Sequence, residues 1–218
     1  IPGQSIQSLH RDMRRLLSYS HITHLSAYEL TVHEQTPLGR HTKCMPLPDE
    51  DTVAAMMETI HETAEKSGFH QYEISNYAKP GHCCRHNMAY WQYHPYIGLG
   101  ASAHSFYPPV REANVADIRQ YITTTGDGGR TTAMHEKLSA SQMKQELLFL
   151  GLRTADGIDD NRYFSRTGEH FCSRRRAPLL NALIAEGYLI QEKSQWRPTK
   201  KGMRFADTLA EKLMHGTV

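Results

Sequence analysis

Apolar residues recur at helical spacing near the start of the chain. Ile6, Leu9, Met13, Leu16 and Leu17 fall on one face of a helix, because helical neighbours lie three or four residues apart. Ser5 stands just before this run and has a side chain that caps helix N-termini well. The pattern predicts a helix that begins after Ser5 and buries one face.

The next segments alternate between strand-like and helical patterns. Residues 22–31 favour a strand, residues 36–48 form a loop with prolines near both ends, and residues 71–77 favour a second strand. Between them Asp49 is expected to cap a helix that ends near Gly68. Strand, helix and strand with short links indicate a crossover unit in a parallel sheet. The first half is therefore predicted to be part of an α/β barrel.

The second half has a mainly helical pattern. Residues 79–110 are rich in loop-forming residues, and a Gly-rich linker over 125–129 predicts a boundary near residue 130, with domains at 1–130 and 131–218. The expected elements after it are helices over 141–152, 160–168 and 178–186, a hairpin of 188–190 with 195–197, and a final helix capped by Thr199. Helices with a short hairpin resemble a small winged-helix module.

Composition restricts the classes of function. The chain has 218 residues, and 25 Lys and Arg against 23 Asp and Glu give a net charge of +2. No overall field therefore favours nucleic acid or an anionic membrane surface. No apolar run is long enough to span a bilayer and no signal sequence is present, so a cytoplasmic protein is expected. The chain starts at Ile1 on a Pro-Gly pair, and we expect it to be an interior portion of a longer protein.

The cysteines do not form a disulfide framework. Cys44, Cys83, Cys84 and Cys172 are irregularly spaced, and adjacent cysteines bridge only with strain. Reduced thiols are the simpler interpretation.

Potential ligands concentrate in residues 82–91, which hold two imidazoles and two thiols within five positions. A zinc site would need further ligands at a regular spacing, and none follows. Haem needs a single axial ligand and aromatic cover, which His86, Tyr90 and Trp91 could supply. The alternative is that Tyr90 and Trp91 are core aromatics while His86 and Asn87 cap a turn, and the residues alone favour this alternative.

Two other groups of residues could contact a ligand. The small residues over 96–104 would allow another backbone or a ligand to approach closely. The basic group consists of Arg174, Arg175, Arg176, Lys200, Lys201 and Arg204. It could contact phosphates, although a solvated helical face is the favoured interpretation.

Several stretches, in order along the chain, resemble the oxygen-independent coproporphyrinogen III oxidase-like radical S-adenosylmethionine (SAM) family, nearest its haem-handling HemW branch. They are Leu25-Ser26-Ala27-Tyr28-Glu29-Leu30-Thr31, Leu47-Pro48-Asp49-Glu50-Asp51, Gln71-Tyr72-Glu73-Ile74-Ser75-Asn76-Tyr77-Ala78, Arg85-His86-Asn87-Met88-Ala89-Tyr90-Trp91 and Tyr96-Ile97-Gly98-Leu99-Gly100-Ala101-Ser102-Ala103-His104. Residues 1–5 and 151–158 match further segments, so the resemblance covers nearly the whole chain.

The resemblance implies an α/β fold: the C-terminal part of a radical SAM barrel of partial TIM type, followed by a mainly helical, winged-helix-like domain. The family's 4Fe-4S cluster sits on a C-x3-C-x2-C loop, which this chain lacks, so no cluster ligand is assigned here. Tyr28, Leu30, Thr31, Ala103 and His104 resemble the wall against which SAM packs.

The resemblance also extends to the haem candidates. Residues 85–91 resemble a His-Asn-x-x-Tyr-Trp signature that has been proposed to hold haem, which assigns haem binding to His86, Asn87, Tyr90 and Trp91 and makes His86 the expected ligand of the iron. The resemblance therefore favours haem binding by these residues, whereas their spacing alone favours core aromatics and a capped turn.

The function implied is that of a radical SAM protein of haem or tetrapyrrole metabolism, either a haem chaperone or a coproporphyrinogen III oxidase-like protein. The Tyr-x-Leu-Thr form at residues 28–31 favours haem handling. The expected partners are haem or porphyrin and haem-accepting proteins, with no nucleic acid and no membrane span. The chain alone is expected to be catalytically inactive. The alternatives are a winged-helix nucleic-acid-binding protein using residues 140–218 and an inactive structural remnant.

Overall fold

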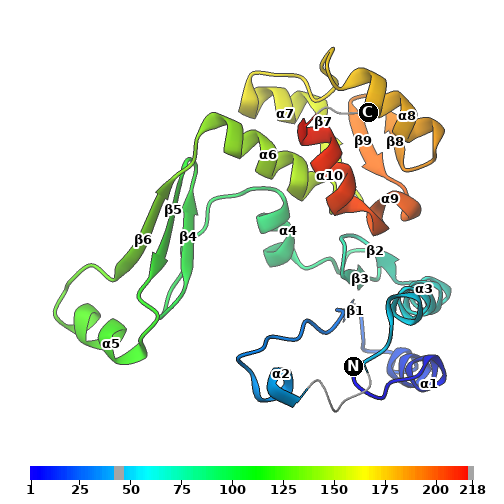
Figure 1. Ribbon diagram of the computed structural model, residues 1–218, viewed down its shortest axis with the longest axis horizontal. Helices are drawn as coiled ribbons and strands as arrows, with labels where there is room; N and C mark the ends of the chain where they lie inside the picture. The colour runs from blue at the N-terminus through cyan, green and yellow to red at the C-terminus, as the bar shows by residue number, and fades with distance from the viewer. Residues whose placement is uncertain (42–46, 216–218) are drawn as a thin grey trace. The chain divides into compact units, whose positions relative to one another are not determined.

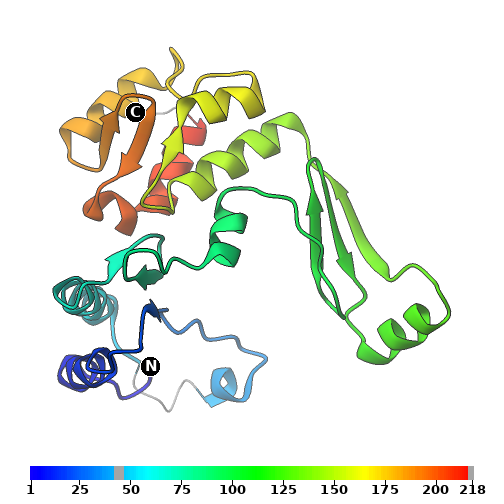
Figure 2. The same cartoon turned by 180° about the vertical axis from the view of Figure 1, so that it is seen from behind.

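The computed structural model describes residues 1–41 and 47–215, and Figures 1 and 2 show it from two sides. It divides into two compact units, residues 1–84 and 85–218, which are described separately below. Cys44 and Pro46, which lie in the predicted loop, fall outside the described residues. No helix among the described residues is long and apolar enough to cross a membrane.

Two capped helices dominate the first unit. Helix α1 (Ile6–Leu17) begins with a capping box, in which the Ser5 side chain accepts a hydrogen bond from the Ser8 backbone and the Ser8 side chain accepts one from the Ser5 backbone. Asp49 caps α3 (Glu50–Lys66). Both predicted helices are confirmed, because periodicity and caps are local features. A short helix, α2 (Pro37–His41), lies within the predicted loop.

The first unit buries one apolar cluster between these helices and a small sheet. Its buried members are Leu9, Met13, Leu25, Met56, Ile60, Ala64, Phe69 and Tyr77. The strands are β1 (His24–Ser26), β2 (His70–Gln71) and β3 (Asn76–Ala78), in the order β1-β3-β2. Both pairings are antiparallel.

The predicted strand over residues 71–77 is wrong, because the chain turns back within it. The Glu73 side chain is buried at 1% exposure and accepts hydrogen bonds from the Ser75 backbone, at 3.2 Å, and from the Asn76 side chain. Burial raises the pKa of this carboxyl, against the effect of these hydrogen bonds. The segment becomes the hairpin β2–β3, so the expected neighbouring parallel strands are replaced by antiparallel pairs.

The second unit starts with α4 (Arg85–Trp91) and a second antiparallel sheet. This sheet has the order β4-β5-β6, with strands β4 (His104–Tyr107), β5 (Val110–Asn114) and β6 (Thr132–Lys137). Helix α5 (Ile118–Gly126) connects β5 to β6 and lies at one end of the narrow sheet, with α6 at the other (Figure 1). The predicted boundary near residue 130 falls on the connection into β6, and it stays a prediction about domain organisation.

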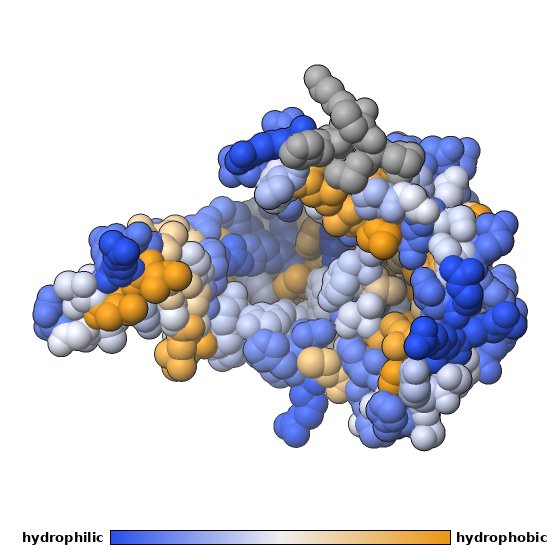
Figure 3. Space-filling model, turned by 90° about the horizontal axis from the view of Figure 1, so that it is seen from below, coloured by the Kyte–Doolittle hydropathy of each residue, from blue (hydrophilic) through white to orange (hydrophobic). Residues whose placement is uncertain are grey.

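Several large apolar side chains of this region remain exposed. Ile97 and Leu99 are 67% and 86% exposed, and Ile118 and Ile122 on α5 are 67% and 63% exposed. Apolar surface accordingly gathers on the part of the molecule that contains α5, at the left of Figure 3.

The rest of the second unit is helical around a third small sheet. Its elements are α6 (Ala140–Gly151), β7 (Ile158–Asp159), α7 (Asp160–Thr167), α8 (Ala177–Ala185), β8 (Leu189–Glu192), β9 (Gln195–Pro198), α9 (Lys200–Arg204) and α10 (Ala206–His215). The strand order is β7-β9-β8, again antiparallel. The three predicted helices and the hairpin are confirmed. The predicted final helix is divided at Phe205 into α9 and α10.

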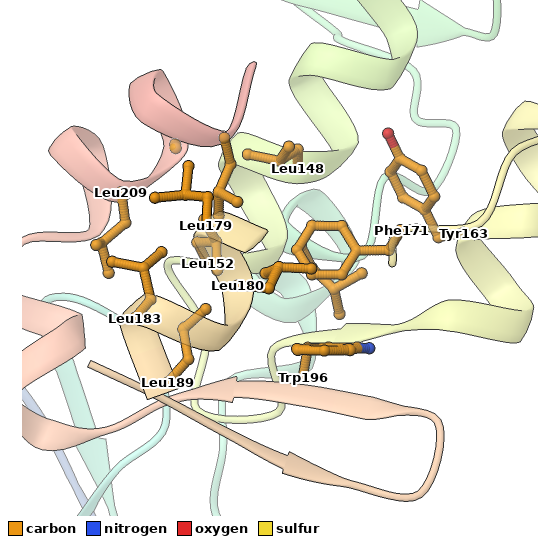
Figure 4. Close-up of a cluster of buried hydrophobic side chains, with 13 residues drawn as sticks. Leu148, Leu152, Tyr163, Phe171, Leu179, Leu180, Leu183, Leu189, Trp196 and Leu209 are labelled. Carbon is orange, nitrogen blue, oxygen red and sulfur yellow. The ribbon is translucent and has the colours of Figure 1, made fainter. Parts of the chain in front are cut away.

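A large apolar core holds this region together. Trp196 and Phe171 meet edge to face, with ring centroids 5.7 Å apart, and leucines from α6, α8 and α10 extend the cluster to one side of these rings (Figure 4). Leu148, Leu152, Leu180 and Leu213 are among the members with 0% exposure. The amphipathic pattern of these helices is explained by this shared core.

Candidate functional site

Helix α4 carries the His-Asn-x-x-Tyr-Trp residues and ends abruptly. Tyr93 has a φ of 59°, in the left-handed region that closes helices. The His94 backbone N–H then donates to the Ala89 carbonyl, at 2.9 Å. The Tyr93 ring is buried and its hydroxyl donates to Glu146, at 2.8 Å. Residues 86–90 therefore lie on one helix, with His86 and Tyr90 one turn apart.

The imidazole of His86 is exposed at the surface of α4. Its ring meets Tyr90 edge-on, with centroids 4.8 Å apart, and Tyr90 in turn meets Tyr96 at 4.6 Å. No side-chain hydrogen bond of His86 or Asn87 occurs within the described part of the chain, so the alternative that they cap a turn has no supporting contact. Both ring nitrogens of His86 remain available to a ligand.

A cavity of about 280 Å³ adjoins Tyr90 and is lined mainly by aromatic and apolar side chains, including Tyr96, Phe106, Phe149 and Leu150. We call it the aromatic cavity. Tyr96 is half-buried, and burial raises the pKa of its hydroxyl. A neutral, ring-lined cavity of this kind suits a flat apolar ligand.

The charged groups at the aromatic cavity are paired with each other. The Nη2 group of Arg111 donates to both oxygens of Glu146, at 3.0 and 2.8 Å, and these charge-assisted hydrogen bonds favour both charges. Burial acts to lower the pKa of Arg111, but the hydrogen bond and charge of Glu146 outweigh it and the pKa is raised. Sequence reasoning missed Tyr96, Arg111 and Glu146, because they come from separate segments.

Trp91 and Asn87 are half-buried. Trp91 does not line the aromatic cavity. It lines a different pocket together with Met88.

The predicted SAM-wall residues lie in both units. In the first unit Tyr28 and Leu30 line a small cavity of about 120 Å³ with apolar side chains of α1 and α3, whereas Thr31 is exposed and outside it. The Tyr28 hydroxyl accepts a hydrogen bond from the Asn76 amide, at 3.4 Å. In the second unit Ala103 precedes β4, and His104 begins it with an exposed side chain.

The thiols are not part of a cluster of metal-binding side chains among the described residues. Cys83 is exposed and Cys84 half-buried, and no group of three or more His, Cys, Asp or Glu side chains placed to hold a metal occurs in the described ranges. Arg175, Arg176 and Lys201 donate to helix-end carbonyls of residues 215, 213 and 186. Three of the six basic side chains are therefore bonded to carbonyls at or near helix C-termini, where a cation is favourable.

Comparisons with known proteins identify similar families and relatives of the chain. Residues 138–205 match the HemN C-terminal domain. The chain is 34% identical to the haem chaperone HemW of Bacillus subtilis, covering 77% of this chain and 45% of that protein. It is 30% identical to the haem chaperone HemW of Escherichia coli, covering 97% and 54%. The zebrafish (Danio rerio) mitochondrial radical S-adenosyl methionine domain-containing protein 1 is 34% identical, covering 72% and 38%.

The fold also has a solved counterpart. The radical SAM enzyme coproporphyrinogen III oxidase (HemN) from Escherichia coli matches 98% of this chain and 52% of that chain, with a TM-score of 0.76 at 14% identity. The chain spans about half the length of the curated relatives it matches. The chain therefore belongs to the oxygen-independent coproporphyrinogen III oxidase-like radical SAM family and is related to the HemW proteins.

Proposed function

We propose that this chain is the haem-handling portion of a radical SAM protein of haem metabolism, and that His86 provides the axial ligand to the haem iron. The observation that carries the proposal is the position of His86. Its imidazole is exposed, makes no hydrogen bond within the described residues, and contacts Tyr90 at the edge of the aromatic cavity. A neutral imidazole with adjacent aromatic rings is a suitable haem site.

The remaining signature residues would complete this site. Bound haem supplies a planar macrocycle with a metal that accepts nitrogen ligands. Tyr90 would cover the macrocycle beside His86, and Asn87 and Trp91 would be the further haem-binding residues of the signature. The chaperone role is favoured over the oxidase role because curated relatives at 30–34% identity are named haem chaperones. Haem-accepting proteins are the partners that this role requires.

The cofactors of the radical chemistry belong to the same proposal. Tyr28, Leu30, Thr31, Ala103 and His104 would form part of the SAM wall, within a barrel to which residues 1–84 contribute. The small cavity at Tyr28 and Leu30 has apolar walls that suit this packing role. The thiols do not fit a 4Fe-4S cluster, since no group of ligands occurs among the described residues. The C-terminal helices and hairpin would form the winged-helix-like domain of a cytoplasmic protein.

Haem titration tests the role of His86. His86→Ala should abolish the Soret shift or weaken haem binding by about tenfold or more, which corresponds to about 1.4 kcal/mol. The matched controls are His82→Ala, which removes an exposed imidazole four residues away, and Cys83→Ser with Cys84→Ser. Loss of the Soret shift in the thiol variant with retention in His86→Ala would assign the iron to the thiols and contradict the proposal.

A further inference from the structure

The face of α4 that carries Trp91 opens on a second pocket, distinct from the aromatic cavity. Met88 and Trp91 line it from α4, and its other walls come from α6, β7, α7 and β9. Its volume is about 280 Å³, and three guanidinium groups, those of Arg162, Arg166 and Arg197, line it. We call it the arginine pocket.

Arg162 and Arg166 lie one turn apart on α7 and converge on a single neutral group. The Gln92 carbonyl accepts from Arg166 at 2.8 Å and from Arg162 at 3.2 Å. Arg162 also contacts the His94 ring nitrogen, at 3.2 Å. Neither guanidinium has a carboxylate within ion-pair distance in the part of the chain that the structure describes. Burial lowers the pKa of Arg166, and the charge of Arg162 lowers it further.

Arg197 adds an unsatisfied donor to the pocket wall. One end of its guanidinium pairs with Glu192, at 3.2 Å. Its Nε atom is buried and has no hydrogen-bond partner among the described residues. A buried donor without a partner is costly unless a ligand or water satisfies it.

Among the described residues, no acidic side chain of the pocket lies within ion-pair distance of Arg162 or Arg166. Asp159 accepts hydrogen bonds from the Arg162 backbone, at 2.8 Å, and from the Ser194 hydroxyl, at 2.7 Å. Both of its carboxylate oxygens are therefore engaged at the start of α7. Asp156 also lines the pocket. Arg197 is paired with Glu192, so the guanidinium groups without an ion-pair partner among the described residues are those of Arg162 and Arg166. Two adjacent guanidinium groups of this kind suit the oxygens of one carboxylate or phosphate group.

We propose that the arginine pocket binds an oxyanion group, a carboxylate or a phosphate, of a small molecule, with Arg162 and Arg166 as its ligands and Trp91 against the adjoining apolar part. Guanidinium groups match the planar geometry of carboxylate and phosphate oxygens. The volume is at the low end of small-molecule pockets, about 300 Å³, so it would enclose an acidic arm and not a whole macrocycle. This inference does not depend on haem binding by His86.

Titration of the full chain with inorganic phosphate or with succinate, at constant ionic strength in chloride, tests the proposal. Tryptophan fluorescence is a suitable measurement, because Trp91 lines the pocket while Trp196 lies in the core at 2% exposure. The wild type should show saturable binding with a Kd on the order of 1 mM. The probe that binds more tightly distinguishes a phosphate site from a carboxylate site.

Charge-removing variants locate the binding site. Arg166→Gln and Arg162→Gln should each weaken binding about tenfold, and Arg166→Lys should weaken it less. Arg119→Gln removes an exposed arginine on α5 and should leave Kd within about twofold. Both pocket variants should fold, since each removes a like-charge repulsion, and circular dichroism checks this. Absence of saturable binding in the wild type, or equal weakening by Arg119→Gln, would overturn the proposal.

The test separates this proposal from the proposed function. His86→Ala should retain anion binding, and Arg166→Gln should retain the Soret shift. Loss of anion binding in His86→Ala would contradict an independent anion site, whatever the haem result.

Discussion

At the scale of single residues, Gly98 is a glycine because a nearby backbone segment of the same chain leaves no space for a side chain. The pattern over residues 96–104 predicted a close approach of another backbone or of a ligand. In the structure a Cβ on Gly98 would lie 2.1 Å from the His104 carbonyl oxygen. The Gly98 N–H also donates to Ser105, at 2.9 Å. The chain's own backbone therefore accounts for this glycine without a ligand.

Substitution at this position should be destabilising. Gly98→Ala would force the backbone of the loop and β4 apart, and we expect a loss of about 1–3 kcal/mol in the free energy of unfolding. Gly126→Ala is the matched control, because a Cβ there meets nothing within 4 Å and alanine is the better helix former. Urea unfolding midpoints measure both. Equal effects of the two changes would contradict the steric explanation.

At the scale of elements, α7 illustrates how a short helix is fixed in place. Asp159 caps its N-terminus, and Gly168, with a φ of 71°, ends it in the left-handed conformation. The helix spans only eight residues, too few to be stable alone. Its caps and its buried Tyr163 therefore maintain the geometry that holds Arg162 and Arg166 together.

The Asp159 cap should give a pH-dependent contribution to stability. Hydrogen bonds from the Arg162 backbone and the Ser194 hydroxyl lower the pKa of this carboxyl. The ionised Asp159 side chain therefore stabilises the folded protein at pH values above the pKa of an unfolded Asp, about 3.9. This contribution is lost as the pH falls through the lower pKa that Asp159 has in the folded protein. Asp159→Ala should cost about 1 kcal/mol at pH 7 and progressively less below about pH 4.

Urea unfolding at neutral and acidic pH measures this difference. Asp127→Ala changes an exposed carboxylate and should stay within about 0.5 kcal/mol of the wild type. A cost of Asp159→Ala that is unchanged at low pH would rule out the ionised cap as its source.

At the scale of the whole molecule, the two compact units have separate cores of different size. Among the described residues, the C-terminal cluster contains thirteen buried residues and the N-terminal cluster contains eight. Six of the thirteen are fully inaccessible, whereas most of the eight retain 5–8% exposure. Because stability rises with the apolar surface buried, the second unit is expected to be the more stable.

Hydrogen exchange should report this difference. Amides of α8 and α10 should exchange more slowly than those of α1 and β1, since local opening requires the least free energy where the core is small. Leu180→Ala removes a fully buried side chain and should lower protection in α8 and α10 by about 2–5 kcal/mol, with α1 and α3 unchanged. Ile190→Ala, at a 42% exposed position, is the control. Equal loss of protection in both units would contradict independent cores.

The sequence by itself determined the features that depend on near neighbours. Apolar spacing and a capping side chain placed α1 and α3, because caps and periodicity act within a few residues. Local spacing also put His86 and Tyr90 on one helical face, where their rings meet. The motifs at residues 25–31, 71–78 and 85–104 resembled the family that the comparisons then showed.

Only the tertiary structure decided the features that depend on distant partners. The β-favouring run at residues 71–77 turns back because Glu73 is buried against its neighbours, and strand pairing depends on tertiary context more than on propensity. Arg162 and Arg166 meet the Gln92 carbonyl across 70 and 74 positions. Side chains so far apart in sequence share no local pattern, and they meet because α4 and α7 both fold into the second compact unit.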